Sequence, residues 1–559
     1  MAYLKSKTLF FTTSPRTPLK MIPEIQVLHN NFEGKKWNTN TQVEFIKKLA
    51  EGSDFDGKGS EKDMAFSARD RINRAPKALG FVDLKPYIKL TEAGENFISG
   101  KRTEEVILRQ LLKFQLPSPY HKEPEEFKGI FCVKPYLEIF RLIYELGTIS
   151  FDELMIFGMQ LTHYNKFDSI VAEIKKFRRM KLYAEMSYKM FRGKYLKEQV
   201  ERIYADDINE GKTKTRESRD KSIDKFVTTK SRNLRDYADA CFRYLRATGM
   251  VEISQRGHSI SIMPEKRKEV EFFLSMVDRK PIYIDDEANY KRYLFDGSLP
   301  ELYSDNRLRL IEQVQEVTGK SSGLEEQTTN ELKDILENAI ANRKKKIISK
   351  QIKELKEYKN YADVMDTFGD IKNNVLYDAP LMLEWNTWRA MTMLDGGDIK
   401  ANLKLDDKGQ PMSTAAGNMS DIVCDYDDFG LAVEVTMQSG QKQYETEGEP
   451  VSRHLAKLKK ETGKDAYCLF IAPKINESCI AYFYALHTMN IAFYGGKSVI
   501  VPLELDVFIN MVEQSYNAGY VPNPQQVKSI FEYSLEQAKN SVDEKEWYAK
   551  VKEKALNWL

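Results

Sequence analysis

Cysteine is scarce in this chain, with five residues far apart among 559. An odd number of widely spaced cysteines argues against a disulfide framework, and the lack of a CxxC pair argues against a zinc ribbon. No apolar run approaches the ~18 residues that a membrane span needs. The N-terminal stretch MAYLKSKTLFFTTSPRTPLK has no signal-peptide core or cleavage site. We therefore expect a cytoplasmic protein with reduced thiols and no membrane contact.

The sequence also lacks a strong net charge, because 85 Lys and Arg residues nearly balance 83 Asp and Glu residues. This balance excludes a uniformly basic protein that coats DNA. It hides an asymmetry, since residues 1–280 sum to +13, residues 281–370 to −4 and residues 371–559 to −7. A basic front half and an acidic back half indicate two tasks, and the length predicts three or four domains.

The front half contains a pattern that occurs twice: a helix stops at a glycine, and a two-stranded ribbon follows. One helix opens at Phe66 and stops at Gly80, and a second helix stops at Gly249. After each glycine, apolar and polar residues alternate, which predicts a β-hairpin. Helices followed by such a hairpin are typical of winged helix-turn-helix modules. Two generic α+β subdomains are the alternative.

Residues 209–235 form a polar stretch with nine Lys and Arg against four acidic residues, and we predict a loop there. Long cationic loops suit phosphate contacts, whereas a solvated loop is the ordinary explanation of an isolated charge run. The basic helices and hairpins nearby favour DNA. Arginine is the commonest reader of guanine, but phosphate contact is the better expectation for any single residue. The candidate DNA contacts in this half are Arg16, Lys20, Arg69, Arg71, Arg74, Lys122, Arg232 and Arg235.

We interpret residues 281–370 as a helical linker. Residues 324–367 contain neither Gly nor Pro, and their apolar residues recur at helical spacing. This pattern predicts one or two long helices, and the apolar repeat is too short to require a coiled coil.

The acidic half contains three carboxylates that can meet at one edge of a sheet. Two apolar segments around the turn Asp427-Asp428-Phe429-Gly430 predict a hairpin. Antiparallel pairing across this turn would place Asp421 beside Glu434, and Glu384 on an earlier helix could join them. Three such carboxylates make a site for Mg²⁺, which can clamp a scissile phosphate and activate water.

The spacing Asp-x12-Glu-x-Thr is that of PD-(D/E)XK nucleases, with Thr436 in place of the usual Lys. By itself this spacing is a weak signal, because two solvent-facing acids around a hairpin occur by chance. Glu434 argues against chance, since it lies within the apolar string AVEV. A carboxylate there is costly unless it is paired or bound to a metal.

A basic helix follows the hairpin in this otherwise acidic half. We expect it to begin near Pro450, after Glu447, and to carry His454 with Arg453 and Lys457 as DNA-binding candidates. Buried strands are predicted after it, at 465–473 and within 496–512. The resulting order of helix, hairpin, helix and strand is that of an α/β nuclease core.

Several long strings now resemble one family, the Type IIS restriction endonucleases of the AlwI, PleI and MlyI kind, with the large subunits of the GAGTC nicking endonucleases. The resemblance covers nearly the whole chain. The strings that carry it are FSARDR (66–71), GFV (80–82), TEAG (91–94), QLPSPYHK (115–122), LEWNTW (383–388), AAGNMSD (415–421), VEVT (433–436), EGEPVSRH (447–454) and YCLFIAP (467–473).

The resemblance implies a multidomain α+β protein that cuts DNA. It implies recognition subdomains at 1–130 and 131–280, the second winged-helix-like, a helical linker at 281–370, and a C-terminal α/β PD-(D/E)XK cleavage domain at 371–559. Such enzymes bind a short asymmetric site in double-stranded DNA and hydrolyse phosphodiester bonds a few nucleotides downstream, with Mg²⁺. Second-strand cleavage would need a second catalytic subunit or a transient homodimer.

The resemblance also assigns roles to residues of the acidic half. Glu384, Asp421 and Glu434 match the catalytic acids of the family and would hold the metal, while Glu447 and His454 match further active-site positions. The family also lacks a Lys at the position of Thr436, so His454 or a metal-bound hydroxide is the expected proton acceptor.

Two other classes of protein fit parts of the same sequence. One is a non-catalytic DNA-binding regulator or replication initiator with winged modules and an inert C-terminal domain. The other is an interaction protein whose basic patches bind acidic partners. Both predict binding without cleavage of DNA.

Overall fold

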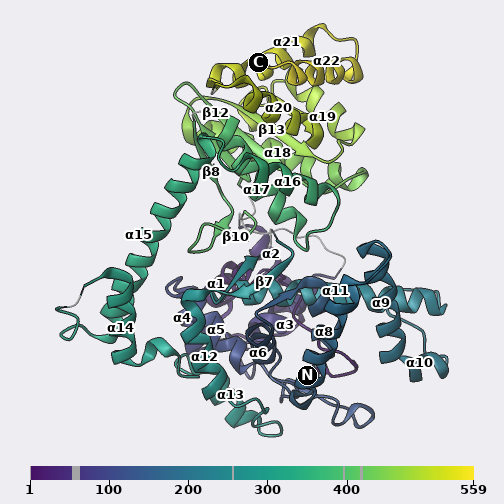
Figure 1. The fold of residues 1–559 in the computed structure, drawn as a ribbon, viewed down its shortest axis with the longest axis vertical. Coiled ribbons are helices and arrows are strands. Elements are labelled where there is room, and N and C mark those ends of the chain that lie inside the picture. Colours follow the sequence, from purple (N-terminus) through teal and green to yellow (C-terminus); the bar gives the residue numbers. More distant parts are fainter. Residues whose placement is uncertain are drawn as a thin grey trace. The chain divides into compact units, whose positions relative to one another are not determined.

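The computed structural model describes residues 2–52, 63–254, 257–320, 322–394, 397–415, 419–520 and 522–559. The chain separates into two compact units, Met1–Glu337 and Asn338–Leu559 (Figure 1). Their boundary falls inside the predicted linker, and the finer division into four segments stays a prediction. The expected multidomain α+β class is confirmed. In the described part of the chain, we find no helix that is long and apolar enough to span a membrane.

The N-terminal unit begins with helices around a short ribbon. Asn38 and Asp63 cap the second and third helices by accepting hydrogen bonds from backbone N–H groups. Thr91 caps the fourth helix and donates a hydrogen bond of 2.6 Å to the carbonyl of Gly80, whose φ is +79°. The ribbon predicted after Gly80 is therefore present. The elements are α1 (Met21–Phe32), α2 (Thr39–Ala50), α3 (Met64–Ala78), β2 (Val82–Asp83), β3 (Lys89–Leu90), α4 (Glu92–Ile98) and α5 (Thr103–Lys113).

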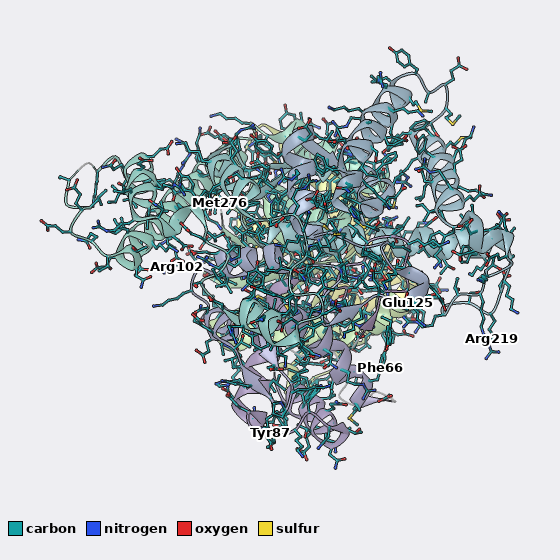
Figure 2. All side chains as sticks on the ribbon, turned by 90° about the horizontal axis from the view of Figure 1, so that it is seen from below. Phe66, Tyr87, Arg102, Glu125, Arg219 and Met276 are labelled. Carbon is teal, nitrogen blue, oxygen red and sulfur yellow. The ribbon has the colours of Figure 1, made fainter. Side chains whose placement is uncertain are left out.

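The loop side of this ribbon is exposed. Tyr87 lies between β2 and β3 with 50% of its surface accessible, and Phe66 near the start of α3 is 52% accessible. Figure 2 shows both at the edge of the molecule. Val82 pairs with Leu90 across the antiparallel ribbon, and both are buried. The ribbon thus packs one face inward, as the alternation of apolar and polar residues predicts.

The second half of this unit contains a three-stranded antiparallel sheet in the order β5-β7-β6. The predicted ribbon after Gly249 is its β6–β7 pair, with Ile253 opposite Ile260. Ser150 and Glu153 form a capping box at the start of α7. The elements are α6 (Pro135–Leu146), β5 (Thr148–Ser150), α7 (Phe151–Ile156), α8 (Phe167–Leu182), α9 (Tyr188–Ile203), α10 (Ala205–Asn209), α11 (Ile223–Arg246), β6 (Val251–Ser254), β7 (Ser259–Ile262) and α12 (Arg267–Met276).

The loop predicted at 209–235 is only half correct. Ser222 caps a long helix, α11, that begins at Ile223. Phe226, Val227 and Leu234 are buried on it, so an amphipathic helix forms despite the density of charge. The nine cationic residues obscure this apolar spacing, which is why the sequence suggested a loop.

The predicted linker is helical, as expected. The stretch without Gly or Pro forms two helices, α15 and α16, and α15 runs across the boundary between the two units. The buried Lys113 of α5 donates hydrogen bonds to the carbonyls of Leu294 and Asp296 at the end of α13. This contact fixes the start of the linker to the N-terminal unit. The helices are α13 (Glu287–Phe295), α14 (Arg307–Thr318), α15 (Thr329–Lys356) and α16 (Tyr361–Lys372).

The C-terminal unit is built around a mixed five-stranded sheet in the order β14-β13-β12-β11-β8. Strands β12, β13 and β14 run parallel to one another, and β11 pairs antiparallel with both β12 and β8. Helix α18 packs on β12 and β13, α17 on β8, and α19 on β14. The predicted hairpin and the predicted strand at 465–473 are both confirmed.

The elements of this unit follow the expected order of helix, hairpin, helix and strand. They are α17 (Ala379–Leu394), β8 (Asp398–Ala401), β9 (Lys404–Leu405), β10 (Pro411–Ser413), β11 (Ile422–Asp425), β12 (Phe429–Val435), α18 (Gln441–Thr462), β13 (Asp465–Ala472), α19 (Glu477–Thr488), β14 (Ile500–Glu504), α20 (Leu505–Ala518), α21 (Pro524–Asn540) and α22 (Glu544–Leu556).

The start of the basic helix was wrongly predicted. Helix α18 begins at Gln441, after Gly440 with a φ of +63°, and Pro450 lies inside it. Proline is usually a helix-start signal because it lacks an N–H group, and that rule misplaced the boundary by about two turns. As a result, Glu447 lies on the same helix as His454 rather than before it.

Candidate active site

The hairpin of the C-terminal unit brings two of the predicted carboxylates to neighbouring strand ends. Ile422 pairs with Val433 in the antiparallel register, so the next positions outward are Asp421 and Glu434. The Oδ2 atom of Asp421 accepts a hydrogen bond of 2.8 Å from the backbone N–H of Val435. The side-by-side placement expected from the turn is therefore confirmed.

Glu384 supplies the third carboxylate from the middle of α17. Its side chain is only 7% exposed, and its Oε2 atom accepts a hydrogen bond of 3.0 Å from the N–H of Ala415. Burial raises the pKa of Glu384 well above its usual value, and the nearby charge of Asp421 raises it further. Glu384 therefore lies close enough to Asp421 for the two charges to interact.

The pKa values of the other two carboxylates are raised in the same way. Burial is the main reason that the pKa values of Asp421 and Glu434 lie well above their usual range. The charge of Glu434 adds to the effect at Asp421, and a hydrogen bond with Ser420 partly offsets it at Glu434. Three buried acids that repel one another form a region where a cation would be stabilised.

Helix α18 adds two more groups on one face, because residues seven apart lie two turns from each other. The Nδ1 atom of His454 lies 2.9 Å from Oε1 of Glu434. Thr436 donates a hydrogen bond of 3.0 Å to Oε1 of Glu447, and burial raises the pKa of Glu447. The residue in the position of the usual Lys thus orients a further acid of the site.

His454 is neutral near pH 7. Burial lowers the pKa of His454 to about 4, and the adjacent charge of Arg453 acts in the same direction. Ionisation of Glu434 would favour the tautomer whose Nδ1–H donates to it, which leaves Nε2 as an acceptor.

The carboxylates do not form a closed ligand shell. Among the described residues, no three His, Cys, Asp or Glu side chains are close enough together to hold a metal ion as they stand. Each acid instead directs one oxygen to a protein donor: Ala415, Val435 or His454. The chemistry of the donors still fits Mg²⁺, which prefers carboxylate oxygens. Binding would require the side chains to converge, and a cation would offset their repulsion.

Two side chains that the sequence did not single out belong to this site. Ser420 hydrogen-bonds Glu434, and Asp378, just before α17, raises the pKa of Glu384 by its charge. Ser420 directly precedes Asp421 and Asp378 directly precedes α17, and these positions could have pointed to the two residues. Neither belongs to the D-x12-E spacing, so that pattern could not select them. Residues 416–418 of the string AAGNMSD lie outside the described residues.

Several candidate DNA contacts of the N-terminal unit are engaged within the protein. Arg71 forms an ion pair with Glu24, which is buried, so this arginine ties α3 to α1. Arg69 donates a hydrogen bond of 2.8 Å to Gln42 of α2. Arg74 pairs with Asp70 on its own helix, and Arg16 pairs with Asp236 of α11. Arg71 and Arg69 thus hold helices together, whereas Arg16 and Arg74 keep more than 40% of their side-chain surface exposed.

Most of the remaining candidates are exposed. Lys20, Lys122, Arg232 and Arg235 are all exposed, the last two on α11. In the other unit, Arg453 and Lys457 lie on α18 and pair weakly with acids one turn away, at 3.4 Å and 3.8 Å. Such exposed pairs exchange readily for phosphate contacts.

Comparison with known proteins agrees with the motifs that pointed to one family. The AlwI restriction endonuclease family matches residues 77–511, which is more than half of the chain. A solved structure, the small subunit (R.BspD6I2) of the heterodimeric restriction endonuclease R.BspD6I, is 28% identical, covers 34% of this chain and 98% of its own, and has a TM-score of 0.29. No curated protein matches the chain. The chain therefore belongs to the AlwI restriction endonuclease family, which supports a Type II restriction-type endonuclease that acts on DNA.

Proposed function

We propose that this protein is a Mg²⁺-dependent endonuclease of the Type IIS kind, or a strand-specific nickase, that recognises a short asymmetric DNA sequence and cuts a few nucleotides downstream. The observation that carries the proposal is the group of buried acids, with raised pKa values, where α17, β11 and β12 meet. Burying carboxylates without a cation is unfavourable. A PD-(D/E)XK assignment of this unit follows from the same acids and from the order of its elements.

Each residue of the site has a distinct part in the proposed reaction. Glu384, Asp421 and Glu434 would hold Mg²⁺, which would supply charge stabilisation at the scissile phosphate and a lowered pKa of water. His454 accepts a proton at Nε2 while its Nδ1–H is held by Glu434. Thr436 keeps the Glu447 carboxylate oriented towards the site. The missing Lys is thereby replaced by an imidazole on α18.

The N-terminal unit is proposed to find the DNA site. Its two ribbons, β2–β3 and β6–β7, each follow a helix that ends at a glycine, which is the arrangement of a winged helix. The excess positive charge of residues 1–280 would supply sequence-independent affinity for phosphates. The exposed Arg232 and Arg235 of α11 are better candidates for DNA contact than the internally paired Arg71.

Removal of divalent cations tests the proposed chemistry. Plasmid DNA incubated with the protein and Mg²⁺ is expected to become nicked or linear, and excess EDTA should stop the reaction completely. Adding Mg²⁺ above the EDTA concentration should restore the original rate, because the carboxylates only need the cation returned. Agarose gels over time give the measurement. Cleavage that continues in EDTA would contradict a metal-dependent mechanism.

Replacing His454 with Asn separates its chemical role from a structural one. The Asn side chain can still donate to Glu434 but has no basic nitrogen, so kcat should fall by about 10²- to 10⁴-fold. The Kd for duplex DNA should stay within about twofold, because the site retains its charge. Single-turnover kinetics and fluorescence anisotropy measure the two quantities. A clear loss of DNA affinity, or a clear fall in Tm, relative to the wild type would mean that His454 only supports the fold.

One active site of this kind cuts one strand, so the proposal includes a partner for the second strand. This partner is either a second catalytic subunit or another copy of the chain in a transient homodimer. The ratio of nicked to linear plasmid across protein concentrations distinguishes the two. A linear fraction that rises with concentration of the purified chain indicates homodimers, whereas persistent nicking indicates a separate subunit or a nickase.

A further inference from the structure

A cluster of exposed apolar side chains lies far from the candidate active site in the sequence, where α8 ends and α9 begins. Single exposed apolar residues are normal on a protein surface, but a contiguous group indicates an interaction site. This group falls within one stretch of eleven residues. Its members and exposed fractions are Met180 (42%), Leu182 (79%), Tyr183 (82%), Met186 (41%), Tyr188 (37%) and Met190 (65%).

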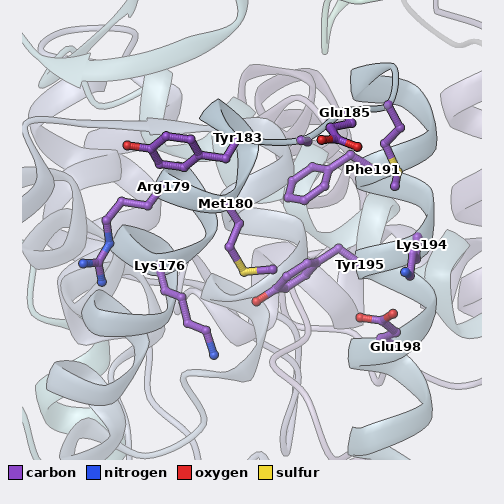
Figure 3. Close-up of a pocket in the computed structure, with 11 residues that line it drawn as sticks. Lys176, Arg179, Met180, Tyr183, Glu185, Phe191, Lys194, Tyr195 and Glu198 are labelled. Atoms are coloured by element: carbon purple, nitrogen blue, oxygen red, sulfur yellow. The ribbon is translucent and has the colours of Figure 1, made fainter.

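A groove of about 700 Å³ opens beside this cluster, between α8 and α9 (Figure 3). Met180, Tyr183 and Met186 line it from the end of α8 and the connecting loop. Phe191 and Tyr195 line it from α9, and both rings pack against Phe177, at 5.3 Å and 5.0 Å. Because these two rings are buried and packed from below, the floor of the groove is formed before any partner binds.

The edge of the groove carries three basic and two acidic side chains, and the acidic ones are Glu185 and Glu198. Lys176, Arg179 and Lys194 line it and are exposed (Figure 3). Within the described residues we find no ion pair for any of the three. Their neighbours differ, because Arg178 is paired with Glu153 and Arg192 with Asp152. Three cations against two acids leave a positive excess around the apolar floor, which complements a ligand that has acidic groups beside an apolar face.

We propose that this groove is a docking site for an acidic, amphipathic helix of a partner protein. An amphipathic helix places its apolar face into such a groove, and methionine side chains adapt to the shape of the inserted residues. The acidic face of the helix would lie against Lys176, Arg179 and Lys194. The surface is separate from the carboxylate site, so the proposal goes beyond the proposed function.

Duplex DNA is the competing occupant, and the lining of the groove argues against it. Interfaces with DNA are polar and consist mainly of contacts to phosphates. Here Met180, Met186 and the rings of Phe191 and Tyr195 form the inside of the groove. A phosphate backbone has no group that would bury these side chains, whereas leucine or tryptophan side chains of a helix do.

A synthetic peptide tests the proposal on the full-length protein. The probe is a fluorescein-labelled helix of 18 residues, with glutamates on one face and leucines and a tryptophan on the other. One control peptide has the same composition in an order that breaks the helical periodicity, and another has lysines in place of the glutamates. By fluorescence anisotropy, we expect the acidic helix to bind at least about tenfold more tightly than either control, which corresponds to about 1.4 kcal/mol of binding free energy.

Variants of the groove locate the binding. Lys176→Glu with Arg179→Glu, and separately Tyr183→Ser with Met186→Ser, should each weaken the acidic peptide at least tenfold, because all four side chains are exposed and their exchange should not disturb folding. The matched control is Lys345→Glu with Lys346→Glu on α15, which are exposed and distant in sequence, and should leave peptide binding unchanged.

Three results would overturn the proposal. The first is that the acidic helix binds no better than its two control peptides. The second is that the groove variants bind it as well as the wild type. The third is that charge reversal at Lys176 and Arg179 leaves peptide binding intact but weakens a duplex oligonucleotide and lowers the dependence of its Kd on salt, which would assign the groove to DNA. Plasmid cleavage is followed in parallel, so that failure here is distinct from failure of the proposed endonuclease activity.

Discussion

Replacing Glu434 with Gln is expected to lower the rate of DNA cleavage by about 10³-fold or more. Glu434 is buried at the end of β12, between Asp421 and His454. The amide keeps the shape of the side chain but removes the charge that would hold Mg²⁺, and it leaves His454 a neutral acceptor in place of a carboxylate. A metal ion supplies several kcal/mol of transition-state stabilisation, and each 1.4 kcal/mol corresponds to tenfold in rate. Single-turnover cleavage of a labelled duplex measures the loss.

A matched control distinguishes the loss of this particular acid from the loss of any negative charge in the C-terminal unit. Glu445→Gln makes the same chemical change on α18, at an exposed position, and should leave the cleavage rate within about twofold, as surface substitutions usually do. Both variants should bind the duplex as the wild type does, because recognition lies in the N-terminal unit under the proposal. Equal activity of the Glu434→Gln protein and the wild type would remove this acid from the mechanism.

Replacing Arg279 with Ala is expected to destabilise the N-terminal unit by about 3–5 kcal/mol. Arg279 forms two hydrogen bonds, of 2.7 Å and 2.6 Å, with the carboxylate of Glu138 on α6, and that carboxylate is fully buried. Its guanidinium also lies 5.5 Å from the ring of Tyr164 and 5.3 Å from that of Phe167. The substitution leaves the buried carboxylate with only the longer contact to Arg141, whose Nε atom lies 4.0 Å away. Calorimetry should show a fall of several degrees in the Tm of one transition.

The two partners of this ion pair should not respond equally. Glu138→Gln leaves an amide that can still bond to the guanidinium, and Arg279 can reach water because a third of its side chain is exposed, so the loss should be about 1–3 kcal/mol. Arg267→Ala is the control, since this exposed arginine pairs with Glu271 on the surface and should change stability by about 0–1 kcal/mol. Similar losses for Arg279→Ala and Arg267→Ala would contradict the importance of the buried pair.

The carboxylate site was largely predictable because its parts are close in sequence. Asp421 and Glu434 are joined by a hairpin whose turn and alternating residues are visible locally, and the strand register follows from them. Glu384 could be selected because a charged residue between apolar neighbours on a helix must find a partner. Only its approach to the hairpin depends on the packing of α17 against the sheet, which no local pattern specifies.

The two wrong predictions arose where a short local pattern was preferred to apolar spacing that extends over several helical turns. Pro450 suggested a helix start, but the apolar spacing of Val451, Leu455 and Leu458 continues from buried Gln443 and Gly448 in the preceding turns. The cationic residues around Arg232 suggested a loop, but Phe226 and Leu234 fit the buried face of α11. In both cases tertiary burial decided the structure. Ion pairs such as that of Arg71 with Glu24 are likewise invisible in sequence, since the two residues are distant along the chain.

The sequence of the DNA ends produced by the protein is the most direct test of the account. Genomic DNA is digested with Mg²⁺, and the new ends are mapped by run-off sequencing, with the Glu434→Gln protein as the blank. The account predicts breaks at one fixed distance downstream of a single short asymmetric sequence, all of them absent from the blank. Ends scattered without a common sequence, or the same ends in both digests, would contradict a site-specific endonuclease built on these carboxylates.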